Sequence, residues 1–371
     1  MRPVVFHLEA TDRAARAGTI GTPHGTIDTP AFMPVGTKGA VRALDGRDLA
    51  EVGTQIVLAN TYHLMLRPGA EAVAARGGLH RFMAWDRPIL TDSGGYQIFS
   101  LDPRVDESGA GFKSTYDGSA AHLTPEDAVR TQELLGPDIA MALDVCIGLP
   151  APKEAVVEAM ERTLRWAERC RTVHRRQDQG LFGIVQGGSD ADLRTESAER
   201  TAALDFDGYG IGGLSVGETP EDRRVALEAA TRSLPVDKPR YVMGLGDTEG
   251  VLDAIERGAD LFDCVWPTRL ARHGRVLSAE GDFNIRRAEF ATDDRPLSSS
   301  CGCSVCLTHT RAYLRHLLSV GEITALRLLS IHNLAYTLDL MAAARRAIGR
   351  QNWGTFRRSL VERRAAAEMR R

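Results

Sequence analysis

Three of the six cysteines of the chain stand within six positions of the sequence, as Cys301, Cys303 and Cys306. Three thiolates this close can share one soft, tetrahedral cation, and Zn²⁺ is the usual one. A disulfide with a spare thiol is the alternative, but a Cys-x-Cys pair is too close for an easy bridge, and nothing in the sequence indicates secretion. A fourth protein ligand would make the metal structural, so the chemistry would lie elsewhere. Spacing alone leaves that ligand open between His309, His316 and His332.

A second set of reactive side chains follows short apolar runs of the sequence. Asp92, Asp144 and Asp263 stand at the ends of three such runs, and Gln186 follows a fourth. Carboxylates around a flat slot suit the cleavage or exchange of a glycosidic bond, because one can attack the anomeric carbon while another exchanges a proton with the leaving group. A further Asp and a Gln have the donors and acceptors to read the edge of a heterocyclic base, and Tyr96 would stack on it.

Each of these carboxylates has a simpler alternative role as the N-cap of the helix that follows. That role explains one Asp well. It explains three less well, because a Gln and two Gly-Gly pairs also stand at the ends of apolar runs, where a helix cap would not require them. The pairs at 187–188 and 212–213 would let a flat ligand approach the backbone closely. Hydrolysis at a metal is disfavoured because no pair of histidines falls on any of the runs. His63, the one histidine at the end of a run, is expected to be structural.

The runs themselves predict the fold. Eight short apolar segments recur, and the later ones alternate with helical stretches at 153–171, 190–204, 219–233 and 248–257. Continuous apolar strands alternating with helices are typical of a parallel sheet covered on both faces, and eight such units predict an α/β protein with a (β/α)₈ TIM barrel. A doubly wound open sheet is the alternative, because sequence alone does not show closure. The eight runs are 30–35, 55–60, 88–91, 138–143, 181–185, 209–214, 240–245 and 261–265.

The chain is longer than a barrel requires. A (β/α)₈ barrel takes roughly 250 residues, and this chain has 371. We expect residues 1–275 to form the catalytic barrel, with a hairpin-like insertion near 102–123. Residues 276–371 are expected to form a zinc-binding subdomain and the C-terminal helices that complete the fold. In such a barrel the strand ends bring their polar residues to one mouth, where active sites lie.

The composition is that of a soluble globular protein, with 43% hydrophobic and 26% charged residues. The N-terminus lacks a long apolar segment and no later stretch could cross a bilayer, so we expect a cytoplasmic protein with free thiols. The net charge of −3 excludes a positive field over the whole protein. Arginines gather locally at 269–287, where they could bind phosphate, and at 345–364, where a solvated helix face explains them.

Several motifs, taken together, resemble those of one known family. They are Ala-Asn-Thr-Tyr-His-Leu at 59–64, Thr-Asp-Ser-Gly-Gly-Tyr-Gln at 91–97, Phe-Gly-Ile-Val-Gln-Gly-Gly at 182–188, and the segments 212–218 and 262–265. A histidine also stands twenty-six positions beyond the last cysteine of the cluster. From about Phe6 to the C-terminal helix, the chain resembles the tRNA-guanine transglycosylases, the queuine tRNA-ribosyltransferase family, in their bacterial form.

The resemblance implies a reaction and its catalytic residues. Asp263 looks like the nucleophile that forms a covalent bond to C1′ of the ribose at the wobble position (34) of tRNAs with a GUN anticodon. Asp92 looks like the general acid/base that handles the proton of the departing guanine and of the incoming base. The implied reaction is a double displacement that replaces guanine with the queuosine precursor 7-aminomethyl-7-deazaguanine (preQ1).

The resemblance also implies a base pocket. Asp144 and Gln186 would hydrogen-bond the base edge, and Gly213 would contact it through its backbone. Tyr96 and Met243 would sandwich the ring. The remaining pocket residues implied are Ser93, Gly94, Gly95 and Leu214.

Two segments and a metal complete the implied sites. One Zn²⁺ per subunit would be structural and would support the surface that docks the RNA. Its implied ligands are Cys301, Cys303, Cys306 and His332. The segments that would hold the RNA around the wobble nucleotide are Gly244, Leu245, Gly246, Asp247, Thr248, Glu249 and Gly250, followed by Thr268, Arg269, Leu270, Ala271 and Arg272.

The implied partners are the tRNAs for Asn, Asp, His and Tyr, a free base (preQ1 or guanine), and a second copy of the chain in a homodimer. Two departures from the family pattern bear on substrate choice. Bacterial members commonly read Asp-Glu-Cys where this chain has Val145 between Asp144 and Cys146, and they often have Asn at the positions of Leu270 and His273. Neither change removes a catalytic group, so we expect activity. The preference among bases and the stringency for tRNA are not predicted.

Two other classes of function are alternatives. A non-catalytic RNA-binding paralogue would be expected to lack the nucleophile or the acid/base, and both are present. A zinc-dependent barrel hydrolase acting on a nucleobase would require an open position on its metal. Within the family, the archaeal enzymes that act in the D-arm are disfavoured by the length of the chain, which we expect to carry no added RNA-binding domain.

Overall fold

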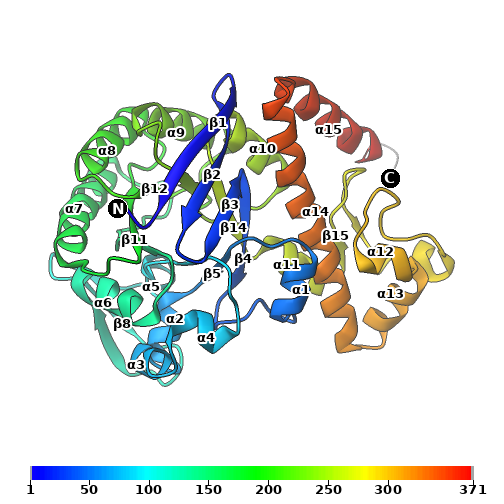
Figure 1. Cartoon of the computed structure of the whole chain (residues 1–371), viewed down its shortest axis with the longest axis horizontal. Coiled ribbons are helices and arrows are strands. Elements are labelled where there is room, and N and C mark those ends of the chain that lie inside the picture. Colours follow the sequence, from blue (N-terminus) through cyan, green and yellow to red (C-terminus); the bar gives the residue numbers. More distant parts are fainter. Residues whose placement is uncertain (1, 369–371) are drawn as a thin grey trace.

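Eight parallel strands close into a barrel in the computed structural model, which describes residues 2–368 (Figure 1). Around the barrel the order is β10-β11-β12-β13-β14-β4-β5-β6. Each strand falls within one of the eight apolar runs or extends one residue beyond it, so the predicted TIM barrel is confirmed and the open sheet is excluded. The strands are β4 (Ala31–Gly36), β5 (Val57–Ala59), β6 (Ile89–Thr91), β10 (Ile139–Met141), β11 (Gly180–Val185), β12 (Gly208–Ile211), β13 (Arg240–Val242) and β14 (Leu261–Cys264).

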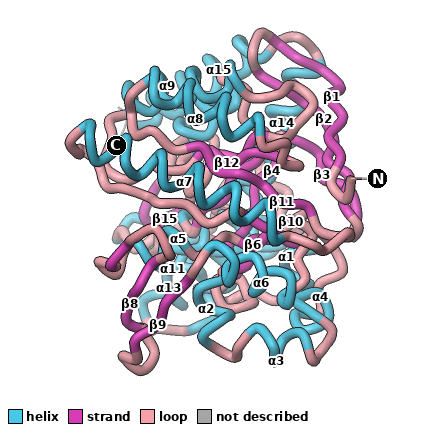
Figure 2. Tube along the Cα trace, turned by 90° about the vertical axis from the view of Figure 1, so that its left-hand side faces the viewer, coloured by secondary structure: helices cyan, strands magenta, loops and turns pink. Residues whose placement is uncertain are grey.

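Helices cover the outside of the barrel (Figure 2). Side-chain caps start several of them: Asp190 accepts hydrogen bonds from two N–H groups at the start of α8, and Asp247 accepts one at the start of α10. The four predicted helices are confirmed as α7 to α10. The helices are α1 (Gly46–Glu51), α2 (Thr61–Leu66), α3 (Ala70–Ala74), α4 (Gly78–Met83), α5 (Gly95–Phe99), α6 (Pro125–Leu135), α7 (Lys153–Val173), α8 (Ala191–Ala203), α9 (Pro220–Ser233), α10 (Thr248–Glu256) and α11 (Trp266–Arg272).

An N-terminal antiparallel sheet, which the sequence did not predict, packs against the inside of the barrel. It consists of β1 (Val5–Asp12), β2 (Ala15–Thr22) and β3 (Gly25–Thr29). Phe6, Ile20 and Ile27 are buried in one apolar cluster with residues that begin barrel strands, among them Ile139 and Leu261. The sheet therefore plugs the N-terminal end of the barrel and leaves the opposite end for the site.

The expected insertion is present as a small antiparallel sheet with the order β7-β8-β9. It consists of β7 (Arg104–Val105), β8 (Ala110–Lys113) and β9 (Ala120–Leu123). Its β8–β9 turn reaches α2, where the Tyr116 hydroxyl lies 3.0 Å from His63 Nδ1 and the Tyr62 hydroxyl donates to Thr115 over 3.1 Å. This hydrogen bond fits the structural role expected for His63.

The C-terminal segment wraps around one long helix. Figure 1 shows α14 between the barrel and the group of α12 and α13, and its Asn333 donates to the carbonyls of Pro267 and Arg275 over 3.0 Å each. The predicted boundary between 1–275 and 276–371 stays a prediction. The elements are β15 (Arg275–Val276), β16 (Phe283–Asn284), the 3₁₀ helix η1 (Ala288–Thr292), α12 (Ser304–Thr308), α13 (Arg311–Ser319), α14 (Ile323–Gly349) and α15 (Trp353–Glu368).

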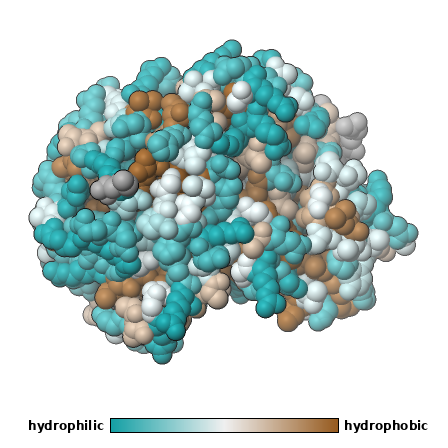
Figure 3. Space-filling view, in the orientation of Figure 1, coloured by the Kyte–Doolittle hydropathy of each residue, from teal (hydrophilic) through white to brown (hydrophobic). Residues whose placement is uncertain are grey.

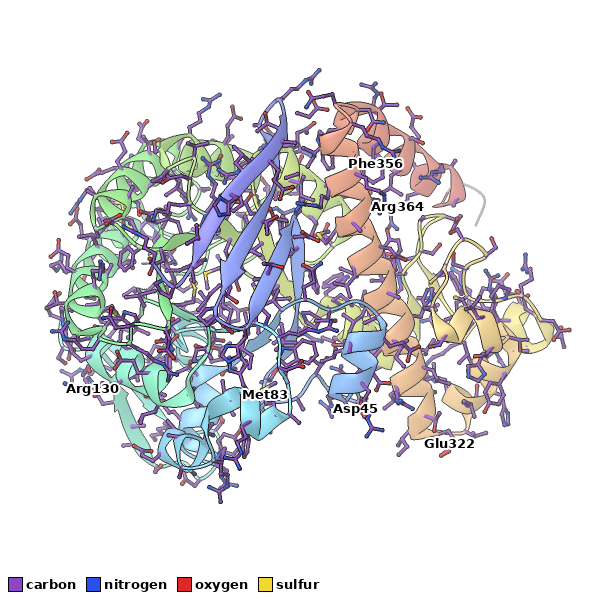
Figure 4. The ribbon with its side chains drawn as sticks, viewed as in Figure 1. Asp45, Met83, Arg130, Glu322, Phe356 and Arg364 are labelled. Atoms are coloured by element: carbon purple, nitrogen blue, oxygen red, sulfur yellow. The ribbon has the colours of Figure 1, made fainter. Side chains whose placement is uncertain are left out.

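Ion pairs fasten this segment at both ends. Figure 4 marks Asp45 at α1 and Glu322 at the start of α14, and in this region Arg327 donates to both oxygens of the buried Asp48, over 2.6 and 2.9 Å. On α15, Arg364 pairs with Asp282 over 3.0 Å and also donates to the carbonyl of Ser278 over 2.6 Å. No helix among the described residues is long and apolar enough to cross a membrane.

The plug predicts a stability effect. Ile20 is fully buried, so Ile20→Ala should lower the free energy of unfolding by about 2–5 kcal/mol, measured by urea denaturation. Val236→Ala, at a side chain that is 62% exposed, should change it by less than about 0.5 kcal/mol. Equal effects of the two substitutions would show that the plug is not part of the core.

Candidate active site and zinc centre

A pocket of about 240 Å³ opens at the C-terminal ends of the barrel strands. Residues that follow β6, β10, β12, β13 and β14 line it, as the barrel prediction requires. Gln186, at the end of β11, reaches it through a hydrogen bond to Asp144. The predicted catalytic and base-binding residues in the lining are Asp92, Ser93, Gly95, Tyr96, Asp144, Gly213, Leu214, Met243 and Asp263.

Asp263 has one oxygen held and one free. The Tyr241 hydroxyl and the Gly244 N–H both donate to its Oδ1, over 2.5 and 2.7 Å. Within residues 2–368, Oδ2 makes no hydrogen bond, and Asp263 is one of the residues that line the pocket. Burial raises the pKa of Asp263, and the two hydrogen bonds oppose that rise. The free oxygen is therefore placed as a nucleophile would be.

Asp92, in contrast to Asp263, is held at both oxygens. Its Oδ1 accepts from the Thr61 N–H over 2.9 Å, and its Oδ2 accepts from the Asn60 side chain over 2.5 Å. Burial raises the pKa of Asp92 to about 7, and the negative charge of Asp263 contributes to the rise. A carboxyl group with a pKa near neutral is populated in both protonation states, which suits a group that gives a proton in one step and takes one in another.

Asp144 forms the far wall of the pocket with Gln186. The Gln186 amide donates to Asp144 Oδ2 over 2.6 Å, and the Ser93 hydroxyl lies 3.4 Å from Oδ1. Burial raises the pKa of Asp144 to about 6. A Cβ at Gly95 would lie 2.8 Å from Asp144, and one at Gly213 would lie 2.2 Å from Gln186. These glycines therefore leave room for the side chains of Asp144 and Gln186. From the sequence, the glycines at 212–213 were expected only to leave room for a ligand.

The hydrogen-bond partners of the two catalytic candidates were not predicted. Asn60 and Thr61 stood in a quoted motif, but nothing in their spacing points to Asp92. Tyr241 is a buried tyrosine in an apolar run, and its hydroxyl needs a partner there. The need of a buried tyrosine hydroxyl for a partner was the one signal in the sequence that could have indicated this contact with Asp263. Tyr96, by contrast, is 56% exposed at the pocket rim, as a lid would be.

The two segments predicted to hold RNA contain both packed and exposed residues. Gly244 is exposed in the pocket lining, while Leu245 is buried and Asp247 caps α10 through the Gly250 N–H. In α11, Arg269 is exposed and Arg272 is half-buried. Burial lowers the pKa of Arg272, and the charges of Arg42 and Arg269 lower it further. The residues of these segments that are buried, and so cannot contact RNA in this conformation, are Leu245, Thr248, Gly250, Thr268 and Ala271.

The cysteine cluster gains its fourth member from α14. Cys301, Cys303, Cys306 and His332 bring their ligand atoms within 4.8 Å of one another. The Sγ atoms of Cys303 and Cys306 lie 3.7 and 3.2 Å from His332 Nδ1, near the separation of about 3.5 Å that tetrahedral zinc requires of its sulfur and nitrogen ligands. His332 Nε2 lies 3.0 Å from the Leu277 carbonyl, which fixes the ring with Nδ1 toward the sulfurs.

The four residues fit a closed, structural Zn²⁺ site. The open choice among three histidines is settled in favour of His332, since His309 instead stacks on Tyr313. An ion there would link the loop at 301–306 to α14. None of the four residues lines the pocket.

A second cluster of potential ligands lies at the other end of the barrel. His24 Nδ1 and His80 Nε2 lie 2.8 and 3.0 Å from the two oxygens of Asp138, and the rings stack with centroids 3.5 Å apart. Asp138 also accepts from the N–H groups of His24 and Ile89. Two nearly parallel stacked rings cannot both aim their in-plane lone pairs at one ion, so this cluster is structural.

The zinc site predicts the effect of losing one ligand. Cys306→Ala should lower the zinc content from one ion per chain to well below one and reduce solubility, because an incomplete site binds its ion poorly. Metal analysis of the purified protein measures the content, and Cys170→Ala, at a buried cysteine outside the cluster, is the control. A stable Cys306→Ala protein that still holds one zinc would show that the cluster has been misread.

The pocket also predicts a pH-dependent stability. The raised pKa of Asp263 means that its contribution to stability is present below about pH 4 and is lost as the pH rises through the folded-state pKa. Asp263→Asn keeps an acceptor for Tyr241 and Gly244 and removes the charge. Its free energy of unfolding, measured by urea denaturation, should therefore exceed that of the native protein at pH 8. The excess should be larger at pH 8 than at pH 5. A difference that shrinks toward pH 8 would contradict this.

Comparison with known proteins shows the family of the chain. A family model described as queuine tRNA-ribosyltransferase matches residues 11–366. A queuine tRNA-ribosyltransferase of Herpetosiphon aurantiacus is 52% identical, covering 96% of this chain and 91% of that protein. Proteins of the same name from Bacillus subtilis and Thermus thermophilus are each 49% identical, over 96% and 100% of this chain and 95% and 96% of their own lengths. The chain belongs to the queuine tRNA-ribosyltransferase family.

Proposed function

We propose that this chain is a tRNA-guanine transglycosylase that exchanges guanine at the wobble position (34) of tRNAs with a GUN anticodon for preQ1. The observation that carries the proposal is the pair of carboxyl groups in one pocket, with a free oxygen on Asp263 and a near-neutral pKa on Asp92. The family of the chain supports the same reaction class.

The proposed reaction is a double displacement with no net oxidation or reduction. The wobble guanosine leaves the stack of the anticodon loop to reach the pocket, because its glycosidic bond is inaccessible while stacked. Asp263 Oδ2 attacks C1′, the bond from C1′ to guanine breaks, and Asp92 gives a proton to the departing base. The incoming base then loses a proton to Asp92 and displaces Asp263 from C1′.

The base would lie between Tyr96 and Met243 and be read at its edge by Asp144 and Gln186. With a pKa of about 6, Asp144 is mostly ionised at neutral pH and accepts N–H groups of the base. Val145, where the chain departs from the family pattern, lines a small cavity of about 40 Å³ together with Asp144. The choice between preQ1 and guanine is set in this region.

The proposed partners are those that the family resemblance implies. The tRNAs for Asn, Asp, His and Tyr would dock over the segments 244–250 and 268–272, with the zinc site supporting that surface from behind. A second copy of the chain would cover apolar side chains of the C-terminal segment, and Figure 3 shows hydrophobic atoms over the region of α12 and α13. We place the homodimer in the cytoplasm. The exposed apolar side chains there are Leu307, Tyr313, Val320 and Ile323.

The two rival functions fit the site less well. An RNA-binding protein without catalysis has no need for two carboxyl groups with raised pKa values in one pocket, since they cost stability. A zinc hydrolase needs an open metal position, whereas the cluster offers four protein ligands and none of them lines the pocket.

The proposal is tested by incorporation of radiolabelled guanine into unmodified tRNA with a GUN anticodon. Incorporation should occur at the wobble position and be absent from a tRNA mutated there. Asp263→Asn should lower the rate by at least about 10³-fold and lose a covalent enzyme–RNA band on denaturing gels, because the nucleophile is gone. Asp294→Asn, at an exposed carboxylate, should keep full activity.

Full turnover of Asp263→Asn would remove Asp263 from the mechanism. Binding of tRNA by the native protein without any incorporation would point to the RNA-binding paralogue.

A further inference from the structure

Helix α8 inserts an arginine under the floor of the base pocket. Arg194 is fully buried, and no carboxylate hydrogen-bonds to it among residues 2–368. Burial lowers the pKa of its guanidinium to about 10, so it stays charged at neutral pH. A buried cation without a paired anion is costly unless other groups satisfy it. Its partners therefore indicate what it does.

Four backbone carbonyls satisfy this guanidinium. Nε donates to Gly188 over 2.7 Å, and Nη1 donates to Val185 and Gly212 over 3.0 and 2.8 Å. Nη2 donates to Gly213 over 3.2 Å. These carbonyls belong to the loops that follow β11 and β12, so a single side chain holds together the two strand ends that carry Gln186 and the 212–214 turn.

The carbonyl contacts determine where the neighbouring N–H groups point. In a planar trans peptide the C=O and the N–H point in opposite directions. Because the carbonyls of Gly212 and Gly213 turn toward Arg194, the N–H groups of Gly213 and Leu214 turn away from it, and both residues line the pocket. Neither N–H makes a hydrogen bond to another residue in the range 2–368. An unpaired pair of donors at a pocket wall is a site for an acceptor.

We propose that Arg194 is a positioning residue for base recognition, which orients the Gly213 and Leu214 N–H groups toward the carbonyl oxygen of the bound base. This inference rests on the proposed function, because it assumes that the pocket binds a guanine-like base. Lysine cannot replace the arginine here, because its three donors on one nitrogen cannot reach four carbonyls arranged around a planar fork. Thus Arg194 acts through the backbone and does not touch the substrate.

The test compares guanine with 2-aminopurine, which has the same ring and amino group but lacks the carbonyl oxygen. Binding of each free base to the full-length protein is measured for the native chain, Arg194→Lys and Arg194→Gln. The native protein should prefer guanine, and the ratio of the two affinities should fall by about tenfold or more in both variants. The KM for tRNA should stay unchanged.

The matched control is Thr201→Val on the same helix. Thr201 is also fully buried, and its hydroxyl has no hydrogen-bond partner within residues 2–368, so this change should leave both affinities and the exchange rate unaltered. Arg194 variants that weaken guanine and 2-aminopurine equally, or that change the KM for tRNA alone, would overturn the proposal.

A measurement on the native protein decides the matter if neither Arg194 variant folds. Guanine should slow hydrogen exchange at the amides of Gly213 and Leu214, whereas 2-aminopurine should not. No protection by guanine would overturn the proposal. Failure of the native protein to incorporate guanine into tRNA would instead overturn the proposed function, so the two outcomes are distinguishable.

Discussion

Negative charge gathered in one small space is the constraint on which the rest of this structure depends. Asp92, Asp144 and Asp263 line a pocket of about 240 Å³, and burial raises the pKa of each. Such a group of carboxylates lowers stability, and hydrogen-bond donors only partly offset that cost. The donors to Asp92 and Asp263 come from the ends of neighbouring strands or the helices that follow, so the barrel has to hold its strand ends rigidly for the charges to remain there.

That rigidity comes from elements on every side of the pocket. The plug of β1 to β3 fills the barrel from the opposite end, with Ile20 and Ile27 in the inner core. Helix α8 holds the ends of β11 and β12 through Arg194. Helix α14 joins the Cys₃His cluster to α11 through His332 and Asn333. The pocket thus occupies the one end of the barrel that remains open to a large substrate.

Much of the architecture was predictable from the sequence because parallel strands buried on both faces are continuously apolar. All eight strands and the carboxylates at their ends followed from that pattern. The plug was missed because its strands mix apolar residues with polar residues and glycines and form no continuous apolar run, and because their partner surface is known only in three dimensions. The same holds for the contact of Tyr241 with Asp263 and for the clamp of Arg194, since both depend on which backbone groups meet in space. The choice of His332 over His309 came from family resemblance, and the position of α14 gives its physical reason.

Direct titration of Asp92 tests most sharply whether burial and the charge of Asp263 together set the pKa of the acid/base. Carbon-13 labelling of aspartate and nuclear magnetic resonance would follow its carboxyl carbon with pH, in the native protein and in Asp263→Asn. The structure predicts a pKa of about 7 in the native protein, and a lower value when the charge of Asp263 is removed. A pKa near 4 in both proteins would contradict a pocket in which burial and the shared charge tune the acid/base.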